Sequence, residues 1–586
     1  MKIKLTKIIF CLFLSFSGSK ISLAANHYFT GLPLDSRGFH DFQAIIDYAD
    51  YGNARVVFVS TSDGVASPST PYYSTSVLTF DSNGFFQAPE EVQAYSSIAT
   101  AASQMRSGYA DIMLLKRGDT FNETPNRWSK NGYSSRARQI IASYGSSGDR
   151  PLLNMGLNLG FAYSANNSGN MIISGLHFYA DLWETEEVAR CWQIADGAYI
   201  HDILIEDSIC RRSNASVQSN STTLAEWPDG IAFRRNQFIE TRRDLGDGAV
   251  PEVNREVSLT AWRIQDYLIE ENLFYKPVEG NRHLYADNFY GNNAPGLILR
   301  GNIFYGSRRT ALSNRSGGTT ANNFFVENDV SLMGGHGSAL AGAVISGAKM
   351  IDNVFQDVHV GDEAIAILAI NLDNAEISRN IITGNQATGN GIRLSTENAG
   401  GSTTYNLTNT TVEDNIIYNT DTGTNTVEAM VFSTFTTSYG NIIRNNDIQL
   451  GDGGDSLVSG PVPAGTTFSG NRFYKSGSTS DWFNPAGTYA TWISSSYANE
   501  SGSSNTQVTY TDPTRTVGSY AGTLGGTATT EGFMTLALGQ SRASWNDNYT
   551  ACAANNYIRA GFGKDAISPE WQDAVAPNSP TGLGVI

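Results

Sequence analysis

Short apolar runs punctuated by asparagine recur along the middle of this chain. In each copy an apolar residue is followed by two variable residues, an asparagine, one variable residue and a second apolar residue. Two earlier copies have Leu176 and Ser208 in place of the asparagine. The centres lie 21 to 36 residues apart, and a period of this length is typical of a solenoid or an array. The asparagines are Asn236, Asn272, Asn302, Asn323 (in a weaker copy), Asn353, Asn380, Asn415, Asn446 and Asn471.

The copies predict strands rather than helices. Each is a short run of β-branched or aromatic residues bounded by Asn, Gly or Asp. No window between residues 170 and 475 sustains a helical period over three turns. Asparagine suits a tight bend, because it tolerates a left-handed backbone and its amide can bond the neighbouring backbone. We therefore expect stacked coils of short strands, with the asparagines bonded to one another along the axis.

A second motif points to a known family. The segment Met113–Phe121 is an apolar strand that runs into a turn at Gly118 and Asp119. Together with the asparagine column, it resembles the right-handed parallel β-helix proteins found among polysaccharide lyases, some glycoside hydrolases and alginate epimerases. The resemblance covers roughly Asp111 to Phe473. It implies an all-β fold, a right-handed parallel β-helix solenoid of about 11 or more coils, with a cap at the N-terminus and a capping region at the C-terminus.

The ends of the chain differ from the repeats. Residues 1–24 combine early lysines, a short apolar run and small residues up to Ala24, which is the pattern of a cleaved secretory signal peptide. The apolar run is too short to span a bilayer. We expect a secreted or periplasmic protein that is not inserted in a membrane.

The remaining boundaries follow the limits of the repeat. Residues 25–110 predict an N-terminal cap with a short helix near Pro89–Met105, and residues 111–475 the catalytic β-helix. Residues 476–586 predict a C-terminal cap and tail, with helical pieces at 533–539 and 549–561. Both ends of a solenoid need covering, because open strand edges invite aggregation.

Charge narrows the class of partner. The 586 residues include 39 basic and 56 acidic side chains, for a net charge of -17, which disfavours nucleic acid. Residues 205–320 hold 14 basic and 14 acidic side chains, so this segment is neutral on an acidic chain. Such a belt can attract an anionic polymer locally, although turn arginines that pair with nearby carboxylates would give the same count. We expect a monomer whose partner is a polysaccharide.

The cysteines leave two readings open. Cys191 and Cys210 lie 19 residues apart and could pair in an oxidising compartment, or both could be buried thiols. The sequence has no CxxC or HExxH motif, so a zinc site has no support.

Offsets from the asparagine column predict where chemistry lies. Tyr285, Arg315 and His336 each follow an asparagine of the column by 13 residues, and Arg309 follows one by seven. Coils of a parallel sheet stack about 4.8 Å apart, so residues of equal offset are expected to lie above one another. The candidate catalytic residues are His283, Tyr285, Arg315 and Arg309. The candidate substrate-binding residues are Arg282, Arg243, His336, Lys276 and Trp262.

These residue types suit β-elimination from a uronic-acid polysaccharide. Arginine can neutralise the carboxylate, for which we assign Arg315 and Arg309. A base must take the C5 proton and an acid must protonate the leaving oxygen, for which we assign His283 and Tyr285. His336 is the reserve base.

The resemblance implies other schemes as well. One has a basic side chain, Lys276, Arg282 or Arg309, as base and calcium as neutraliser, so calcium is the possible cofactor. No compact loop motif marks a calcium site, and the metal ligands stay unassigned. A glycoside hydrolase would instead use two carboxylates. A third reading is a non-catalytic glycan-binding rod. The carboxylates available to calcium are Asp229, Asp244, Asp247 and Asp287, and those available to a hydrolase are Asp229, Asp266 and Asp287.

Overall fold

The chain is seen here in a computed structural model. It describes residues 26–569. The ranges left out within it are 49–50, 90–91, 157, 164–167, 183–188, 196–198, 241–256, 276–286, 308–309, 336–344, 359–363, 385–388, 397–405, 420–426, 434, 436, 452–455, 478–479 and 496–498.

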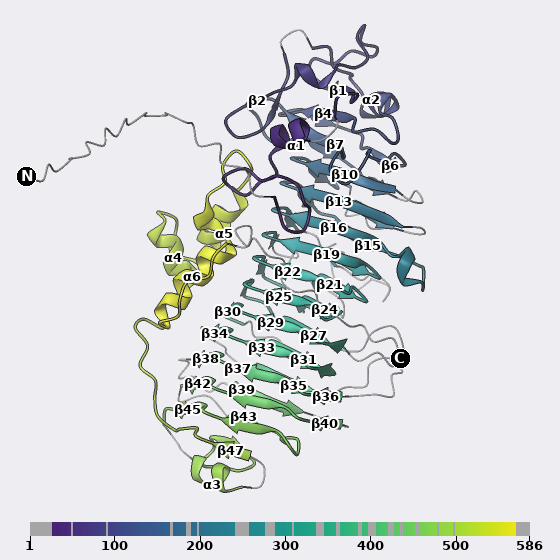
Figure 1. The fold of residues 1–586 in the computed structure, drawn as a ribbon. Coiled ribbons are helices and arrows are strands. Elements are labelled where there is room, and N and C mark those ends of the chain that lie inside the picture. Colours follow the sequence, from purple (N-terminus) through teal and green to yellow (C-terminus); the bar gives the residue numbers. More distant parts are fainter. Residues whose placement is uncertain are drawn as a thin grey trace, which may run out of the picture.

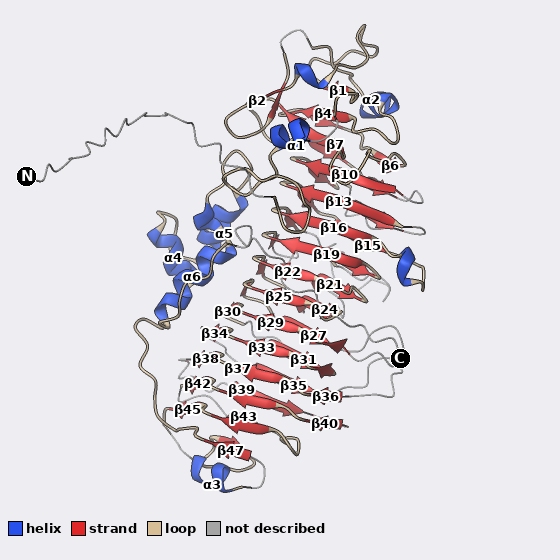
Figure 2. Cartoon of the chain, in the orientation of Figure 1, coloured by secondary structure: helices blue, strands red, loops and turns tan. Residues whose placement is uncertain are grey.

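The chain winds into a right-handed parallel β-helix, as the sequence predicts (Figure 1). A full coil contributes one strand to each of three long sheets, and each strand pairs in parallel with its counterpart on the next coil, as β10, β13 and β16 do. Figure 2 shows the strands stacked along one axis, with helices near its ends, α4, α5 and α6 along one flank, and a short helical turn beside β15.

We number the sheets in the order in which a coil visits them. Sheet 1 comprises β1 (Val56–Val59), β2 (Thr79–Phe80), β3 (Phe86–Gln87), β4 (Ile112–Lys116), β7 (Gln139–Tyr144), β10 (Ser168–Ser174), β13 (Ile200–Glu206), β16 (Asp229–Arg234), β19 (Gln265–Glu270), β22 (Ile298–Arg300), β25 (Thr319–Ala321), β29 (Lys349–Ile351), β33 (Glu376–Ser378), β37 (Thr411–Glu413), β41 (Ile442–Arg444), β44 (Thr467–Ser469) and β47 (Asn499–Ser501).

Sheet 2 follows sheet 1 in each coil. It comprises β5 (Thr120–Phe121), β8 (Leu152–Asn154), β11 (His177–Tyr179), β14 (Ile209–Arg211), β17 (Gln237–Ile239), β20 (Leu273–Tyr275), β23 (Ile303–Tyr305), β26 (Phe324–Val326), β30 (Val354–Gln356), β34 (Ile381–Thr383), β38 (Ile416–Asn419), β42 (Asp447–Leu450) and β45 (Arg472–Lys475).

Sheet 3 completes the coil, and a small fourth sheet is inserted after it in four of the later coils. Sheet 3 comprises β6 (Asn126–Trp128), β9 (Leu159–Tyr163), β12 (Arg190–Ala195), β15 (Asn214–Gln218), β18 (Leu259–Trp262), β21 (Asp287–Asn292), β24 (Thr310–Arg315), β27 (Val330–Gly335), β31 (Ile365–Ile370), β35 (Gly389–Ser395), β39 (Val427–Ser433), β43 (Ser456–Ser459) and β46 (Phe483–Asn484). The fourth comprises β28 (Ile345–Ser346), β32 (Leu372–Asp373), β36 (Asn406–Thr408) and β40 (Thr437–Tyr439).

The predicted asparagine column forms a continuous hydrogen-bonded ladder at the corner between sheets 1 and 2. Asn236 donates from its backbone N–H and from Nδ2 to Oδ1 of Asn272, at 2.9 and 3.1 Å. The same pair of bonds repeats down to Asn471, whose N–H bonds Oγ of Ser503. The residue before each ladder asparagine has a positive φ, such as 53° at Arg235, so every coil bends sharply at this corner.

Aromatic side chains stack inside the solenoid in the same register. Phe238, Phe274, Phe304, Phe325 and Phe355 lie at equivalent positions of sheet 2, with ring centroids 4.7 to 4.9 Å apart and ring planes within 8° of parallel. One repeated position therefore contributes the same apolar packing to each coil, which is why neighbouring coils stabilise one another.

The first strand of sheet 1 lies before the predicted start of the β-helix. β1 pairs in parallel with β4, so sheet 1 begins within residues 25–110. The helix predicted near Pro89–Met105 is present but shorter. The helices at this end are α1 (Phe42–Tyr48), α2 (Ile98–Gln104) and the 3-10 turn η1 (Thr75–Val77), and a further 3-10 turn, η2 (Leu224–Glu226), lies between β15 and β16.

The C-terminal region returns along the side of the solenoid. The helical pieces predicted at 533–539 and 549–561 are present, but they pack on the outer face of sheet 2 and not over the C-terminal end, where α3 lies (Figure 1). The reason is that sheet 2 presents apolar side chains outward, among them Ile303, Phe324 and Ile381, and the helices bury them. The helices are α3 (Tyr489–Ser494), α4 (Val517–Thr523), α5 (Thr530–Leu538) and α6 (Ala551–Gly561), with the 3-10 turn η3 (Asp547–Tyr549).

The structure resolves the open question about the cysteines. Cys191 of β12 and Cys210 of β14 form a disulfide, and Cys552 of α6 is buried and takes no part in it. Within the described ranges, no helix is long and apolar enough to cross a bilayer. The predicted signal peptide lies outside the described residues.

Candidate functional site

The structure describes two of the nine predicted site residues, Arg315 and Trp262. Both lie at the carboxyl ends of sheet 3 strands, Arg315 on β24 and Trp262 on β18. The other seven lie outside the described residues, and they are His283, Tyr285, Arg309, Arg282, Arg243, His336 and Lys276.

The register of sheet 3 brings Trp262 and Arg315 into one outward-facing column. Trp262 pairs with Asn292, and Asn292 pairs with Arg315. Alternate residues of these strands, such as Leu259, Phe289 and Leu312, point into the core. Trp262, Asn292 and Arg315 therefore share the outer face, and about 10 Å separates the first rung from the third.

The guanidinium of Arg315 is held in place by an aromatic ring. It lies over Tyr290, with 5.0 Å between the guanidinium carbon and the ring centroid. The Tyr290 hydroxyl accepts a hydrogen bond of 3.4 Å from Nδ2 of Asn292. Within the described part of the chain, Arg315 makes no ion pair, and its buried Nε has no acceptor. Oδ1 of Asn292, a residue only 3% exposed, likewise has no donor there. Leaving such buried groups unpaired costs free energy.

The offset rule that suggested Arg315 is wrong about Tyr285. It aligned Arg315 with Tyr285, whereas the register aligns Arg315 with Asn292. The cause is the connection between β20 and β21, which spans residues 276–286 and shifts the following strand by seven positions. His336, which the rule placed in the same column, lies outside the described residues. The two residues sequence reasoning missed, Tyr290 and Asn292, carry a signal in hindsight, because both are polar outward positions on a strand that alternates with core residues.

Two of the three carboxylates considered for a hydrolase come together elsewhere. Asp229 and Asp266 lie at the start of β16 and β19, neighbouring strands of sheet 1. Burial raises the pKa of Asp229, and the charges of Asp266 and Asp202 raise it further. Burial also raises the pKa of Asp266. Asp287 begins β21 in sheet 3, so it belongs to a different corner of the coil.

An aromatic pair borders these carboxylates. The hydroxyl of Tyr199 donates to Oδ2 of Asp229 at 3.4 Å, and its ring stacks on that of His201 at 5.2 Å between centroids. Nδ1 of His201 contacts Oδ2 of Asp202 at 2.9 Å. His201 pairs with Asp229 in the register of sheet 1, so the group occupies two neighbouring rungs. It combines proton-carrying side chains with a ring suited to a sugar face.

A third polar cluster is fully enclosed. Glu206, Arg234, Glu270 and Arg300 occupy one register position on four successive strands of sheet 1, and we call them the charge ladder. Nη1 of Arg234 contacts Oε1 of Glu206 at 2.7 Å, Nε of Arg234 contacts Glu270, and Nη2 of Arg300 contacts Oε1 of Glu270 at 2.6 Å.

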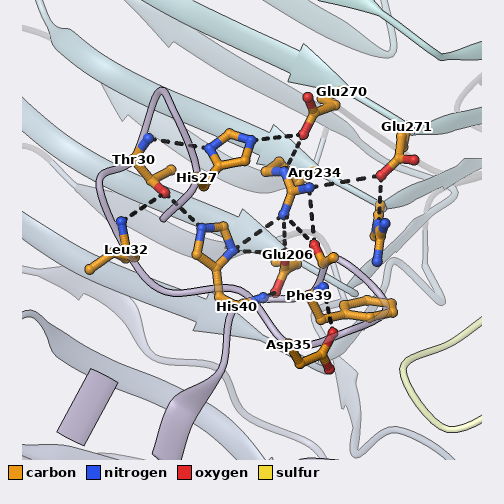
Figure 3. Close-up of polar contacts among 12 residues, drawn as sticks. His27, Thr30, Leu32, Asp35, Phe39, His40, Glu206, Arg234, Glu270 and Glu271 are labelled. Atoms are coloured by element: carbon orange, nitrogen blue, oxygen red, sulfur yellow. Dashed lines mark hydrogen bonds and ion pairs between the residues drawn. The ribbon is translucent and has the colours of Figure 1, made fainter. Parts of the chain in front are cut away.

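The two ends of the chain cover this ladder. From the N-terminal segment, His27 contacts Glu270 at 3.1 Å and His40 contacts Glu206 at 2.9 Å (Figure 3). From the C-terminal segment, Nη2 of Arg542 contacts Oε2 of Glu206 at 2.9 Å. The side chains of the two histidines and of Glu206 are 0% exposed, so no ligand reaches them, and the ladder joins chain ends to the solenoid.

We expect the folded protein to lose stability in mild acid, because His27 and His40 are buried against the charge ladder. Burial lowers the pKa of His27 from 6.5 to about 3 and also lowers that of His40. A histidine whose pKa is lower in the folded state binds a proton more readily when the protein is unfolded. The contribution of these histidines to stability is therefore fully present above pH 6.5 and is lost as the pH falls below that value. The pKa of Glu206 is held below its ordinary 4.5, so its own effect begins only near that pH.

Thermal unfolding between pH 7 and 5 measures the histidine contribution. The wild-type melting temperature should fall over this interval, and a His27→Gln/His40→Gln variant should fall less steeply. His177 should leave a residual slope, because burial lowers its pKa to about 4. An equal slope in both proteins would contradict the assignment.

The possible calcium cofactor receives no ligand set from this structure. Among the residues described, no group of three or more His, Cys, Asp or Glu side chains is arranged to hold a metal ion. Of the carboxylates considered for calcium, Asp244 and Asp247 lie outside these residues, while Asp229 and Asp287 lie in different sheets.

Comparison with known proteins gives matches of structure alone. No family model matches the sequence, and no curated protein does. A GH136 lacto-N-biosidase from Eubacterium ramulus is similar with a TM-score of 0.33 and 11% identity, over 77% of this chain and 67% of that one. The periplasmic alginate epimerase AlgG is similar with a TM-score of 0.36 and 11% identity, over 71% of this chain and 82% of that one. The PL6-family alginate lyase AlyGC is similar with a TM-score of 0.38 and 15% identity, over 66% of this chain and 51% of that one.

These scores describe a distant likeness of fold. The chain is a right-handed parallel β-helix protein whose structural neighbours include a lacto-N-biosidase, an alginate epimerase and an alginate lyase.

Proposed function

We propose that this chain is a secreted or periplasmic lyase that cleaves a uronic-acid-containing polysaccharide by β-elimination. The observation that carries the proposal is the guanidinium of Arg315, which is exposed in part, stacked on Tyr290 and without an ion-pair partner among the described residues. A planar guanidinium binds a carboxylate in two-pronged fashion, and stacking on a ring reduces the conformational freedom lost on binding.

The surroundings of Arg315 support a sugar as its ligand. Trp262 lies two rungs away on the same outer face and offers an indole to the apolar face of a pyranose. Asn292 lies between them, and its buried amide donates to the Tyr290 hydroxyl at 3.4 Å, next to the stacked guanidinium. A carboxylate at Arg315 and a ring at Trp262 would bind sugars two units apart in an extended chain that runs along the solenoid axis.

The reaction follows from neutralising the carboxylate. Arg315, with Arg309, offsets the charge of the uronate and so acidifies the proton on C5. His283 takes that proton, the electron pair forms the C4–C5 double bond, and the C4–O bond breaks. Tyr285 returns a proton to the leaving oxygen. Arg282, Arg243, Lys276 and His336 complete the proposed binding surface, with His336 as the reserve base.

A panel assay tests this function. The mature chain, residues 25–586, is incubated with alginate, pectate, glycosaminoglycans and neutral or sulfated galactans, with and without chelator. Ultraviolet absorbance and reducing ends are followed together, because elimination creates an unsaturated product and hydrolysis does not. We expect both signals to rise with an acidic polymer. Silence with every acidic polymer would contradict the proposal.

A hydrolase is the second candidate, favoured by the carboxylate pair Asp229 and Asp266. A carboxyl with a raised pKa can stay protonated and act as general acid on a glycosidic oxygen, while its partner serves as base or nucleophile. In this case reducing ends would appear without absorbance. Asp229→Asn should then lower kcat about a hundredfold or more, whereas Asp287→Asn should leave it near the wild-type value. Full activity of Asp229→Asn would reject the pair.

A further inference from the structure

Three exposed tyrosines mark the edge at which the first rungs of sheet 1 begin. Tyr72, Tyr109 and Tyr133 are 41%, 43% and 61% exposed. Tyr72 adjoins the start of β1, because the neighbouring Tyr73 bridges to Val56. Tyr109 precedes β4, and Tyr133 precedes β7. β1, β4 and β7 are successive rungs, near the upper end of the solenoid in Figure 1.

The loops that carry Tyr109 and Tyr133 are bonded side by side. The N–H of Gly108 donates to the carbonyl of Asn131 at 2.9 Å, and the N–H of Asn131 bonds Oγ of Ser107 at 3.2 Å. These bonds lie within two residues of Tyr109 and Tyr133. Tyr109 and Tyr133 therefore lie on the loops of neighbouring rungs, and rungs are about 4.8 Å apart, close to the length of one sugar in an extended chain.

Two guanidinium groups are built into the same surface. Arg55 lies over the ring of Tyr72 at 4.1 Å, and Arg106 lies over that of Tyr109 at 3.8 Å. The buried Asp111 fixes both arginines, because its Oδ1 accepts from the N–H of Arg55 at 2.8 Å and from Nη2 of Arg106 at 2.7 Å.

The charge at this surface is positive on an acidic protein. Asp111 raises the pKa of Arg106, and the hydroxyls of Tyr109 and Tyr72 add to the effect, so both phenols lie near that guanidinium. Lys130 is also close by, bonded to the carbonyl of Met105 at 2.7 Å. The carboxylate of Asp111 neutralises the charge of Arg106, with which it forms an ion pair. The side chain of Arg55 makes no ion pair within the described residues, and its Nη1 donates to the carbonyl of Gln104.

We propose that Tyr72, Tyr109 and Tyr133, together with Arg55 and Arg106, form a second, non-catalytic binding surface for an acidic polysaccharide. Exposed rings bind sugar faces, and the adjoining guanidinium groups select a polymer that carries carboxylates or sulfates. The proposal rests on the proposed function for the identity of the polymer. The coil that carries Arg315 begins at β22, five rungs from β7 and so roughly 24 Å away. A long polymer can contact both surfaces at once, and a short oligosaccharide cannot.

Affinity electrophoresis of the full mature chain tests this surface. Gels containing alginate, pectate or a neutral galactan are run with wild type, with Tyr72→Ala/Tyr109→Ala/Tyr133→Ala, and with Tyr439→Ala. Tyr439 is the matched control, because it is 56% exposed and lies on the fourth sheet, far along the solenoid. The triple variant should bind the acidic polymer about tenfold more weakly, since each lost ring removes a modest contribution. Arg55→Gln should weaken retention by the acidic polymer and leave the neutral gel unchanged.

Turnover of a short oligosaccharide separates this surface from the catalytic one. The triple variant should cleave a tetrasaccharide at the wild-type rate and lose efficiency only on the polymer. Retention of the triple variant equal to that of Tyr439→Ala, or lack of retention of the wild type by any acidic polymer, would overturn the proposal. If retention is lost in the triple variant but the wild type never produces an unsaturated product, the binding surface stands and the lyase function falls.

Discussion

Replacing Arg315 with alanine should lower kcat/KM on the acidic polysaccharide by about a thousandfold, the scale at which a single charge-stabilising group acts in an active site. The substitution removes the cation proposed to neutralise the uronate, so the C5 proton becomes less acidic and the barrier to its removal rises. The indole of Trp262 would stay, so binding through the remaining sugar contacts should be reduced less than turnover. Steady-state kinetics followed by ultraviolet absorbance measures both parameters.

Two further variants show whether the loss of activity comes from the missing guanidinium of Arg315. Arg315→Lys keeps the charge but not the planar fork and should recover part of the activity. Arg444→Ala removes an exposed arginine that pairs with Glu413 on sheet 1, and it should retain full activity. Wild-type kinetics in Arg315→Ala would place the neutralising group elsewhere, although the protein could still be a lyase.

Arg234→Ala should destabilise the protein by about 3–5 kcal/mol, which is the usual cost of removing one partner from a buried ion pair. Arg234 has no exposed side-chain surface and contacts both Glu206 and Glu270 of the charge ladder. It also donates to the carbonyl of Gly38 at 3.2 Å, so its loss loosens the N-terminal segment as well. Two buried carboxylates would be left with less compensating charge, and both would be driven toward protonation.

Denaturant unfolding at pH 7 measures this effect. Arg444→Ala is the matched control, because it breaks an arginine–glutamate pair on the same sheet whose arginine side chain is 46% exposed. That variant should lose less than about 1 kcal/mol. Similar losses in the two variants would mean that the ladder contributes no more than a surface pair. Limited proteolysis should also show earlier cleavage before residue 42 in Arg234→Ala.

The repeat was predictable from the sequence because its cause is local. The side chain of each ladder asparagine bonds the backbone of the preceding coil, and its own N–H is bonded by the asparagine of the next coil, so the same residue is needed at the same place in every coil. The apolar positions on either side of Asn302, for example, lie in the core with 0% exposure, at Leu299 and Phe304. A six-residue pattern therefore determines the corner, the inward direction and the strand on each side.

The site was less predictable because it depends on turn lengths. Residue type and offset from the ladder make Arg315 a candidate, but its neighbours follow from the connections between sheets 2 and 3, which vary from coil to coil. Residues at equal offsets from the ladder do not align here, because the connection from β20 to β21 is longer than the connection from β23 to β24. The place of α5 was unpredictable for a similar reason. Its sequence indicates a helix, whereas its partner is an apolar sheet face some 200 residues earlier in the chain, as in the contact between Phe324 and Phe533.

The meeting of the two chain ends on the charge ladder sets the order in which the protein can be completed. Arg37 donates to the carbonyl of Arg542 at 2.6 Å, across 505 positions of sequence. A ribosome makes the N-terminal segment first, and the coils can stack as they emerge. The carboxylate of Glu206 acquires Arg542 only after residue 542 has been made. Until then the upper coils lack their cover, so a chain truncated before residue 542 leaves this carboxylate without one of its cations and exposes the ladder that the finished protein encloses.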